Sequence, residues 1–172
     1  DEFLGYKLGE RFTPHYRMVD YFKHVDGAMA NVEVRQYGET YEHRPLIYTI
    51  ITSKENFNQL ERIRTDNLKR TGLMEGSPGS DKKAIVWLSY NVHGNEASSL
   101  EASMLTLYAL ADPGNAKTQE WLTNTVVVLD PCVNPDGRDR YANFYNQFMN
   151  NPANGSIDAK EHREPWPNGR SN

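Results

Sequence analysis

The sequence has little cysteine and no long apolar run, and these absences narrow what the protein can be. One cysteine, Cys132, among 172 residues excludes an internal disulfide framework. No apolar run approaches the ~20 residues that a membrane-spanning helix needs. The opening DEFLGYKLGERF lacks the charged start and apolar stretch of a secretory signal, so none is expected in the chain as given, and a signal removed ahead of Asp1 stays an open alternative.

Positive charge is also scarce. The chain holds 19 Lys and Arg against 23 Asp and Glu, a net charge of -4, and no basic block interrupts this average. Nucleic acid is therefore not expected as a partner, because a phosphate-binding surface needs clustered Lys and Arg. There is no internal repeat, and the length fits a single domain over residues 1–172.

Short apolar runs alternate with helical patterns through the first 130 residues. Apolar residues recur at helical spacing over residues 14–25, 54–72 and 96–111, which predicts three helices. Thr13 is the expected cap of the first helix. Strand patterns occupy residues 31–37, 46–51, 84–90 and 125–130. The run AIVWLSY at 84–90 is the strongest signal for a buried strand.

The second half of this pattern has the length of a βαβ unit. The strand at 84–90, the helix at 96–111 and the strand at 125–130 predict a right-handed crossover between parallel strands. The loops that begin at Asn91 and Pro131 then leave the same edge of the sheet, where open α/β sheets bind ligands. We expect an α/β fold with a mixed, partly parallel sheet and helices on both faces.

The first of these loops carries a candidate metal pair, His93 and Glu96, in the sequence HGNE. Spacing of three across a strand-to-helix turn lets an imidazole from the loop and a carboxylate from the first helical turn reach one point, and Gly94 lets the backbone bend between them. Zinc suits such a nitrogen and oxygen pair. The pattern alone is also typical of an ordinary surface turn.

The second loop reads PCVNPDGR from Pro131 to Arg138. Its Pro135-Asp136-Gly137 segment is a turn signature, because proline presets the first corner and glycine accepts the dihedral that closes the turn. Taken singly, these residues indicate a structural turn.

Three motifs in order carry a family resemblance: HGNE after one buried strand, NPDGRDRY after the next, and the late NGRSN. Over roughly residues 84–172 the chain resembles the N-terminal half of a zinc carboxypeptidase of the M14 family. Residues 1–83 resemble the leader of bacterial members less specifically. The resemblance implies an incomplete zinc-carboxypeptidase-like fold and a peptide substrate with a free C-terminus.

The resemblance also implies roles for single residues. His93 and Glu96 match the first two ligands of one Zn²⁺ ion, and Arg170 matches the arginine that polarises the scissile carbonyl. The third ligand, the Asn-Arg pair that grips the substrate carboxylate, a tyrosine and the general-base glutamate have no matching motif and are expected beyond Asn172. The chain then resembles a fragment that is inactive alone and holds zinc weakly or not at all. Family resemblance favours a secreted or periplasmic location.

Two other functions stay open on the residues alone: a zinc amidohydrolase acting on small N-acyl amino acids, and a metal-free binding or structural domain. Cys132 is expected as a small core side chain, and Asp130 either as support for the site or as a strand-end cap. Residues 150–172 are polar and expected to be mobile, and Asn154 begins a glycosylation sequon. The remaining histidines are expected to be solvated: His15, His24, His43 and His162.

Overall fold

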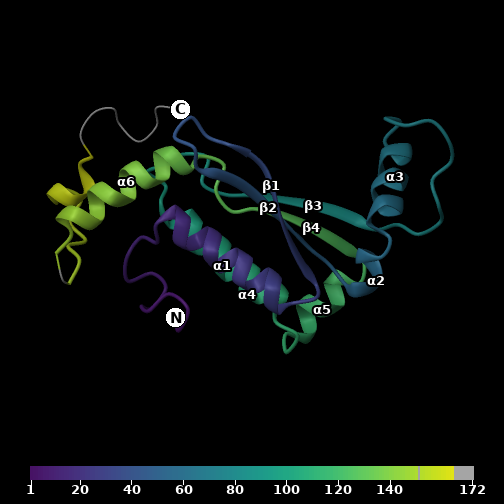
Figure 1. The fold of residues 1–172 in the computed structure, drawn as a ribbon, viewed down its shortest axis with the longest axis horizontal. Coiled ribbons are helices and arrows are strands. Elements are labelled where there is room, and N and C mark those ends of the chain that lie inside the picture. Colours follow the sequence, from purple (N-terminus) through teal and green to yellow (C-terminus); the bar gives the residue numbers. More distant parts are fainter. Residues whose placement is uncertain (151, 165–172) are drawn as a thin grey trace.

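A mixed sheet lies at the centre of the computed structural model, which describes residues 1–150 and 152–164. In this part of the chain the sheet has four strands in the order β1-β2-β4-β3 (Figure 1). The strands are β1 (Val32–Glu39), β2 (Pro45–Ile51), β3 (Ala84–Ser89) and β4 (Thr125–Asp130). β1 and β4 each pair with β2 antiparallel, whereas β3 and β4 are parallel. The predicted mixed, partly parallel α/β sheet is confirmed.

One face of the sheet carries the main core. Helices α1 (His15–Ala28) and α4 (Ser98–Ala111) lie together on it (Figure 1). Met18 and Phe22 of α1 and Leu100 and Leu107 of α4 are fully or almost fully buried against Leu129 of β4. Helical spacing places these side chains on the buried stripe, which is why the two helices were predictable from the sequence.

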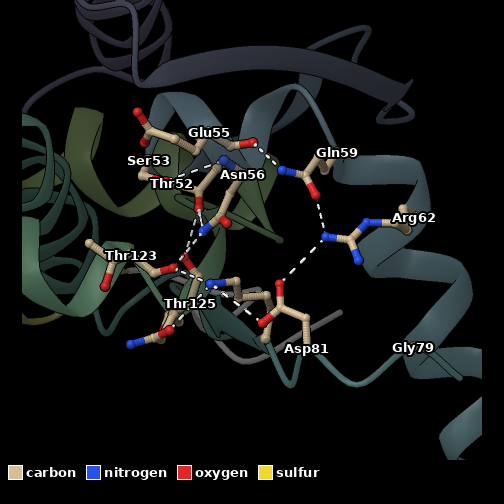
Figure 2. Close-up of polar contacts among 12 residues, drawn as sticks. Thr52, Ser53, Glu55, Asn56, Gln59, Arg62, Gly79, Asp81, Thr123 and Thr125 are labelled. Atoms are coloured by element: carbon tan, nitrogen blue, oxygen red, sulfur yellow. Dashed lines mark hydrogen bonds and ion pairs between the residues drawn. The ribbon is translucent and has the colours of Figure 1, made fainter.

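The opposite face is covered in part by α2 (Lys54–Phe57) and α3 (Leu60–Arg70). The prediction of one continuous helix is wrong here, because the chain turns at Asn58 and Gln59. Figure 2 shows the buried Asn56, whose amide donates to Thr52 Oγ1 at 3.0 Å and to the Thr123 carbonyl at 3.2 Å. These bonds fix α2 to the end of the sheet, and α3 starts afresh in a direction that buries Ile63.

Strand β3 is exposed, and the prediction of a buried strand is wrong. Ile85 is 42% and Trp87 64% exposed. β3 ends the strand order and pairs with β4 alone among the described residues. The other end of the sheet, β1, has charged residues and an irregular register between Gln36 and Gly38. β3 has neither, although it lies at an edge.

Three elements were not expected. They are α5 (Ala116–Leu122), α6 (Pro135–Phe148) and the short 3-10 turn η1 (Lys160–His162). The start of α1 also differs, because Pro14 occupies the cap position and the Thr13 hydroxyl accepts a hydrogen bond from Tyr6 at 3.0 Å. His15 is buried rather than solvated.

The described part of the polar C-terminal segment lies against α6. Glu161 is buried and accepts hydrogen bonds from Asn150 Nδ2 at 2.8 Å and from the Asn154 amide at 3.0 Å. Glu164 forms an ion pair of 2.7 Å with Arg140 of α6. None of the helices that the structure describes combines the length and the apolar character that crossing a bilayer requires.

Candidate metal centre

His93 and Glu96 lie in the loop between β3 and α4, with their side chains turned toward each other. His93 Nδ1 is 3.1 Å from Glu96 Oε2, and the side chains are 35% and 53% exposed. Both therefore remain open to solvent at the edge of the sheet where β3 and β4 end. The expected convergence of an imidazole and a carboxylate on one point is present.

The position of Glu96 differs from the prediction in one respect. Glu96 was expected in the first turn of the helix, but α4 begins at Ser98. Glu96 instead lies in a tight turn in which its amide donates to the His93 carbonyl at 3.2 Å. This turn, and not the helix, brings the carboxylate back to the imidazole.

The two donor atoms fit zinc in kind and in spacing. Imidazole nitrogen and carboxylate oxygen bind Zn²⁺ at about 2.0–2.2 Å, which puts two ligand atoms of a tetrahedral ion about 3.4 Å apart. The observed 3.1 Å between Nδ1 and Oε2 differs from this by a shift that two exposed side chains make readily. Within residues 1–150 and 152–164, no three His, Cys, Asp or Glu side chains form a metal-binding group.

Asn91 holds this loop from behind. It is buried and has a positive φ of 55°. Its side-chain Nδ2 donates to the His93 carbonyl at 2.7 Å and to the Glu96 carbonyl at 3.4 Å. This role of Asn91 is not among the predictions from the sequence, although an asparagine just after a strand is the residue type that tolerates the left-handed conformation.

The second loop meets the first at the start of α6. Asn134 caps this helix, with Oδ1 accepting from the Gly137 amide at 3.0 Å, and its Nδ2 donates to the Val92 carbonyl at 3.1 Å. The Pro135-Asp136-Gly137 segment is therefore the first turn of a helix and not an isolated turn. Asparagine followed by proline is the expected signature of a cap and first helical residue, and it was the available signal.

A cluster of charges lies on the other side of α6. Asp136 accepts hydrogen bonds from Thr40 Oγ1 at 2.7 Å and from Arg44 Nη1 at 2.6 Å. Burial raises the pKa of Asp136, but these two hydrogen bonds outweigh it and hold the pKa below its usual value. Arg44 also reaches Asp139 at 3.1 Å. The β1-β2 hairpin is thereby fixed to α6 at the same edge of the sheet as His93.

A cleft of about 820 Å³ opens between this hairpin and α6. Its walls include Glu39 and Glu42 of the hairpin, Asn134 and Arg140 of α6, and Val92, the residue before His93. His93 and Glu96 do not line the cleft, so the metal pair lies beside it.

The contacts of Asp130 and Cys132 indicate structural roles for both residues. Asp130 accepts hydrogen bonds from the Tyr37 hydroxyl at 2.8 Å and from the Cys132 amide at 3.3 Å, so it closes the end of β4. Burial raises the pKa of Asp130 above its usual value. Burial also raises the pKa of the Cys132 thiol to about 12, which keeps it protonated as expected for a core side chain.

The other predicted residues lie away from the pair or outside the described chain. The His24 ring lies against the Phe3 ring, tilted by 30° with the ring centroids 4.9 Å apart, and the His162 Nε2 is 2.8 Å from the Asn154 carbonyl. His43 lies 3.5 Å from Glu39. Arg170 lies outside the described residues, so the structure does not place it.

Comparisons with known proteins extend this picture. The zinc carboxypeptidase family model, Peptidase_M14, matches residues 18–172. Among solved structures, carboxypeptidase A from Helicoverpa armigera is 18% identical with a TM-score of 0.55, and the alignment covers 75% of this chain and 26% of that one. Thrombin-activatable fibrinolysis inhibitor is 15% identical with a TM-score of 0.55, covering 77% of this chain and 28% of that one.

A bacterial structure gives the same result. The metallo-carboxypeptidase from Burkholderia cenocepacia is 17% identical with a TM-score of 0.50, covering 72% of this chain and 27% of that one. No curated protein matches the sequence significantly. The chain thus shares its fold with these proteins and spans about a quarter of their length.

Proposed function

Because the chain belongs to the zinc carboxypeptidase family, we propose that the complete protein is a metallocarboxypeptidase that releases C-terminal amino acids from peptides. The observation that carries the proposal is the pair His93 and Glu96, 3.1 Å apart at the carboxyl ends of two parallel strands. Nitrogen and oxygen donors in this arrangement are typical of a catalytic zinc site.

In this proposal His93 and Glu96 hold one Zn²⁺ ion. When bound, such an ion polarises a carbonyl oxygen and lowers the pKa of water. The loop supplies the geometry: Asn91 fixes the carbonyls of His93 and Glu96, so the two side chains leave a backbone that is already ordered. Such preorganisation avoids the cost of ordering the ligands when the ion binds.

Arg170 is proposed as the residue that stabilises the oxyanion. The proposal rests on the match of its NGRSN segment to the family pattern. A guanidinium presents several donors in a fixed fork, which suits an oxygen that gains negative charge in the transition state. Its contact strengthens as that charge develops, so replacing it is expected to affect turnover more than substrate binding.

The remaining parts of the machinery are proposed to come from sequence beyond Asn172. Two findings support this: the chain spans 26–28% of the three structures named above, and no third ligand joins His93 and Glu96 among the described residues. The missing parts are a third ligand histidine, an Asn-Arg pair for the substrate carboxylate, a tyrosine and a general-base glutamate. We infer that the 172-residue chain alone is inactive and binds zinc weakly, and that the complete protein is secreted or periplasmic.

The test assays the 172-residue chain and a longer product of the same gene on two peptides, one with a free C-terminus and one amidated. We expect chelator-sensitive cleavage of the free peptide by the long form only, because without a general base and a carboxylate-binding pair the substrate is neither activated nor positioned. Equal cleavage of the amidated peptide contradicts a carboxypeptidase. Cleavage by the 172-residue chain contradicts the proposal that the general base and the carboxylate-binding pair lie beyond Asn172.

Zinc binding separates this function from a metal-free domain. Zinc should bind the 172-residue chain with low affinity and be lost in His93→Ala, because that substitution removes one of only two protein ligands. Calorimetry on both proteins gives the answer. Tight binding that survives His93→Ala contradicts the assignment of the pair.

A further inference from the structure

The loop that carries His93 and Glu96 is held by the first turn of α6 at three points. Asn134 Nδ2 donates to the Val92 carbonyl at 3.1 Å, just before His93. Gly94, between the two candidate ligands, lies so close to Gly137 that a Cβ atom there would be 2.1 Å from the Gly137 carbonyl carbon. Arg138 Nε donates to the Ala97 carbonyl at 3.0 Å, just after Glu96. The loop is thus fixed before, between and after the pair.

Arg138 connects this loop to two further segments. Its side chain is fully buried, and Nη2 lies 3.0 Å from Glu101 Oε1 in the first turn of α4 and 3.2 Å from the Thr13 carbonyl. Glu101 Oε1 in turn accepts from the Thr13 amide at 2.6 Å. One guanidinium therefore joins the start of α4 to α6 and to the segment before α1.

The start of α4 depends on this contact from outside the helix. Its cap residue is Ala97, which makes no side-chain hydrogen bond to the helix. Alanine is among the weakest capping residues, so the local sequence does not define where the helix begins. Arg138 holds the Ala97 carbonyl and the Glu101 carboxylate together, and this places the helix start at Ser98, two residues after Glu96.

Stability alone does not explain a buried arginine at this position. Replacing a buried ion pair by apolar side chains of similar size is often neutral or stabilising. Nη1 of Arg138 is buried and has no hydrogen-bond partner among the described residues, which adds to the free-energy cost of burying the guanidinium. An apolar residue, however, cannot bind a carbonyl and a carboxylate at once, as the rigid fork of a guanidinium does.

We propose that Arg138 is a positioning residue, which through Ala97 and Glu101 sets the separation of His93 and Glu96 and so the affinity of the pair for a divalent cation. This role rests on the proposed zinc site. Residues that orient metal ligands without touching the ion typically change metal affinity 10–100-fold when removed. Arg138 would act in this way through the Ala97 carbonyl, next to Glu96, although it lies 42 residues from Glu96 in the sequence.

The test compares a double variant with a control in the same helix. Arg138→Met with Glu101→Gln removes both charges and leaves an amide oxygen for the Thr13 N–H. Leu107→Ala opens a cavity in the fully buried part of α4 and leaves the loop contacts in place. Zinc chloride titrations of the 172-residue chain are followed by the NMR signals of the His93 ring, and thermal unfolding is recorded for each protein.

We expect zinc affinity to fall about tenfold or more in the double variant. The Leu107→Ala chain should bind zinc like the wild type even though it unfolds at a lower temperature. Arg138→Lys keeps the positive charge but loses the planar fork of the guanidinium, so zinc affinity should fall in this variant as well. Unchanged affinity in the double variant overturns the proposal, as does an equal loss in Leu107→Ala.

Amide hydrogen exchange gives a second readout that needs no metal. Exchange at Asn95, Glu96 and Ala97 should accelerate in the double variant and in Arg138→Lys, but not in Leu107→Ala. If His93→Ala leaves zinc binding unchanged, the proposed zinc site is wrong. The role of Arg138 is tested separately: amide exchange as slow as in the wild type in the arginine variants would show that Arg138 does not order the loop. If the double variant does not fold, Arg138→Lys decides both measurements.

Discussion

Gly94 illustrates at the scale of one residue how closely two distant motifs are fitted together. A side chain at this position would meet the Gly137 carbonyl carbon at 2.1 Å and the Arg138 amide nitrogen at 2.7 Å. Backbone atoms, unlike the end of a flexible side chain, cannot move aside without displacing α6. The glycine is therefore required by the contact between the HGNE loop and α6.

The corresponding prediction is that Gly94→Ala lowers the free energy of unfolding by about 3 kcal/mol or more, because it overpacks backbone against backbone. Gly27→Ala is the control, since the space around Gly27 in α1 is open. It should leave stability unchanged or raise it by up to about 1 kcal/mol, because alanine is the better helix former. Urea unfolding of both variants measures the difference, and equal effects would contradict the contact.

His15 is a second residue whose surroundings set its behaviour. It is almost completely buried, with Asp139, Arg44, Asp136 and Arg138 as the charged groups around it. Burial, opposed in part by Asp139, lowers the pKa of His15 to about 4. The folded protein therefore keeps this ring neutral in a range where the unfolded chain protonates it.

We predict that His15 makes the protein acid-sensitive. Between pH 6.5 and about 4 the unfolded chain binds more protons at this ring than the folded protein does, so stability falls as the pH falls through that window. The loss from this group approaches about 3 kcal/mol below pH 4. In His15→Leu the stability difference from wild type should shift in favour of the variant across the same window. A constant difference would show that the ring titrates normally.

Helix α6 begins at Pro135, in a segment whose sequence pattern predicts a turn. Asn134 satisfies the Gly137 amide and also reaches the Val92 carbonyl. The capping bond is local, and the sequence contains its signature. The bond to Val92 crosses 42 residues and has no local signature.

We predict that Asn134→Ala lowers the free energy of unfolding by about 1–2 kcal/mol and speeds amide exchange in the HGNE loop. The control is Asn115→Ala, which removes the side chain that caps α5. This second variant should lose similar stability without a change in the exchange of the loop. Equal exchange in both variants would mean that Asn134 is a cap and nothing more.

In the candidate site, too, some features follow from the local sequence and others depend on residues that are distant in the chain. Hydrophobic periodicity and strand order predicted that the loops after β3 and β4 meet, and the HGNE pattern predicted the pair. The start of α4 was predicted two residues too early, because Ala97 gives no capping signal and Arg138 fixes the start from elsewhere in the chain. His15 likewise has a distant partner: its backbone amide donates to Asp139 Oδ1 of α6 at 2.9 Å, a contact that no pattern around His15 reveals.

At the scale of the whole molecule, β3 has the sequence of an interior strand and the position of an edge strand. Ile85, Val86 and Trp87 are exposed, and β3 has no charged residue along its length. Natural sheets protect their edges with charges, prolines or bulges, as β1 does here. The apolar character of β3 is visible in its sequence, but which segments of the chain lie beside it is not.

We predict that the 172-residue chain associates with itself through β3 at micromolar concentrations, because among the described residues β3 pairs with β4 alone and also exposes apolar side chains. Trp87→Lys should shift the sedimentation profile toward the monomer. Tyr16→Lys is the control, since Tyr16 in α1 is 66% exposed and Trp87 is 64% exposed. A similar shift in both variants would mean that apolar exposure in general, and not the edge, drives association.

The place of β4 in the middle of the sheet constrains the order in which the molecule can be assembled during synthesis. β1 and β2 can pair as a hairpin once residue 51 has been made, but β2 and β3 acquire their shared neighbour only when residues 125–130 follow. At ~5–20 residues per second, the 73 residues between Ile51 and Thr125 take about 4–15 s. During that interval the edge of β2 that will receive β4 has no partner, so the nascent chain depends on its environment to keep that edge from pairing elsewhere.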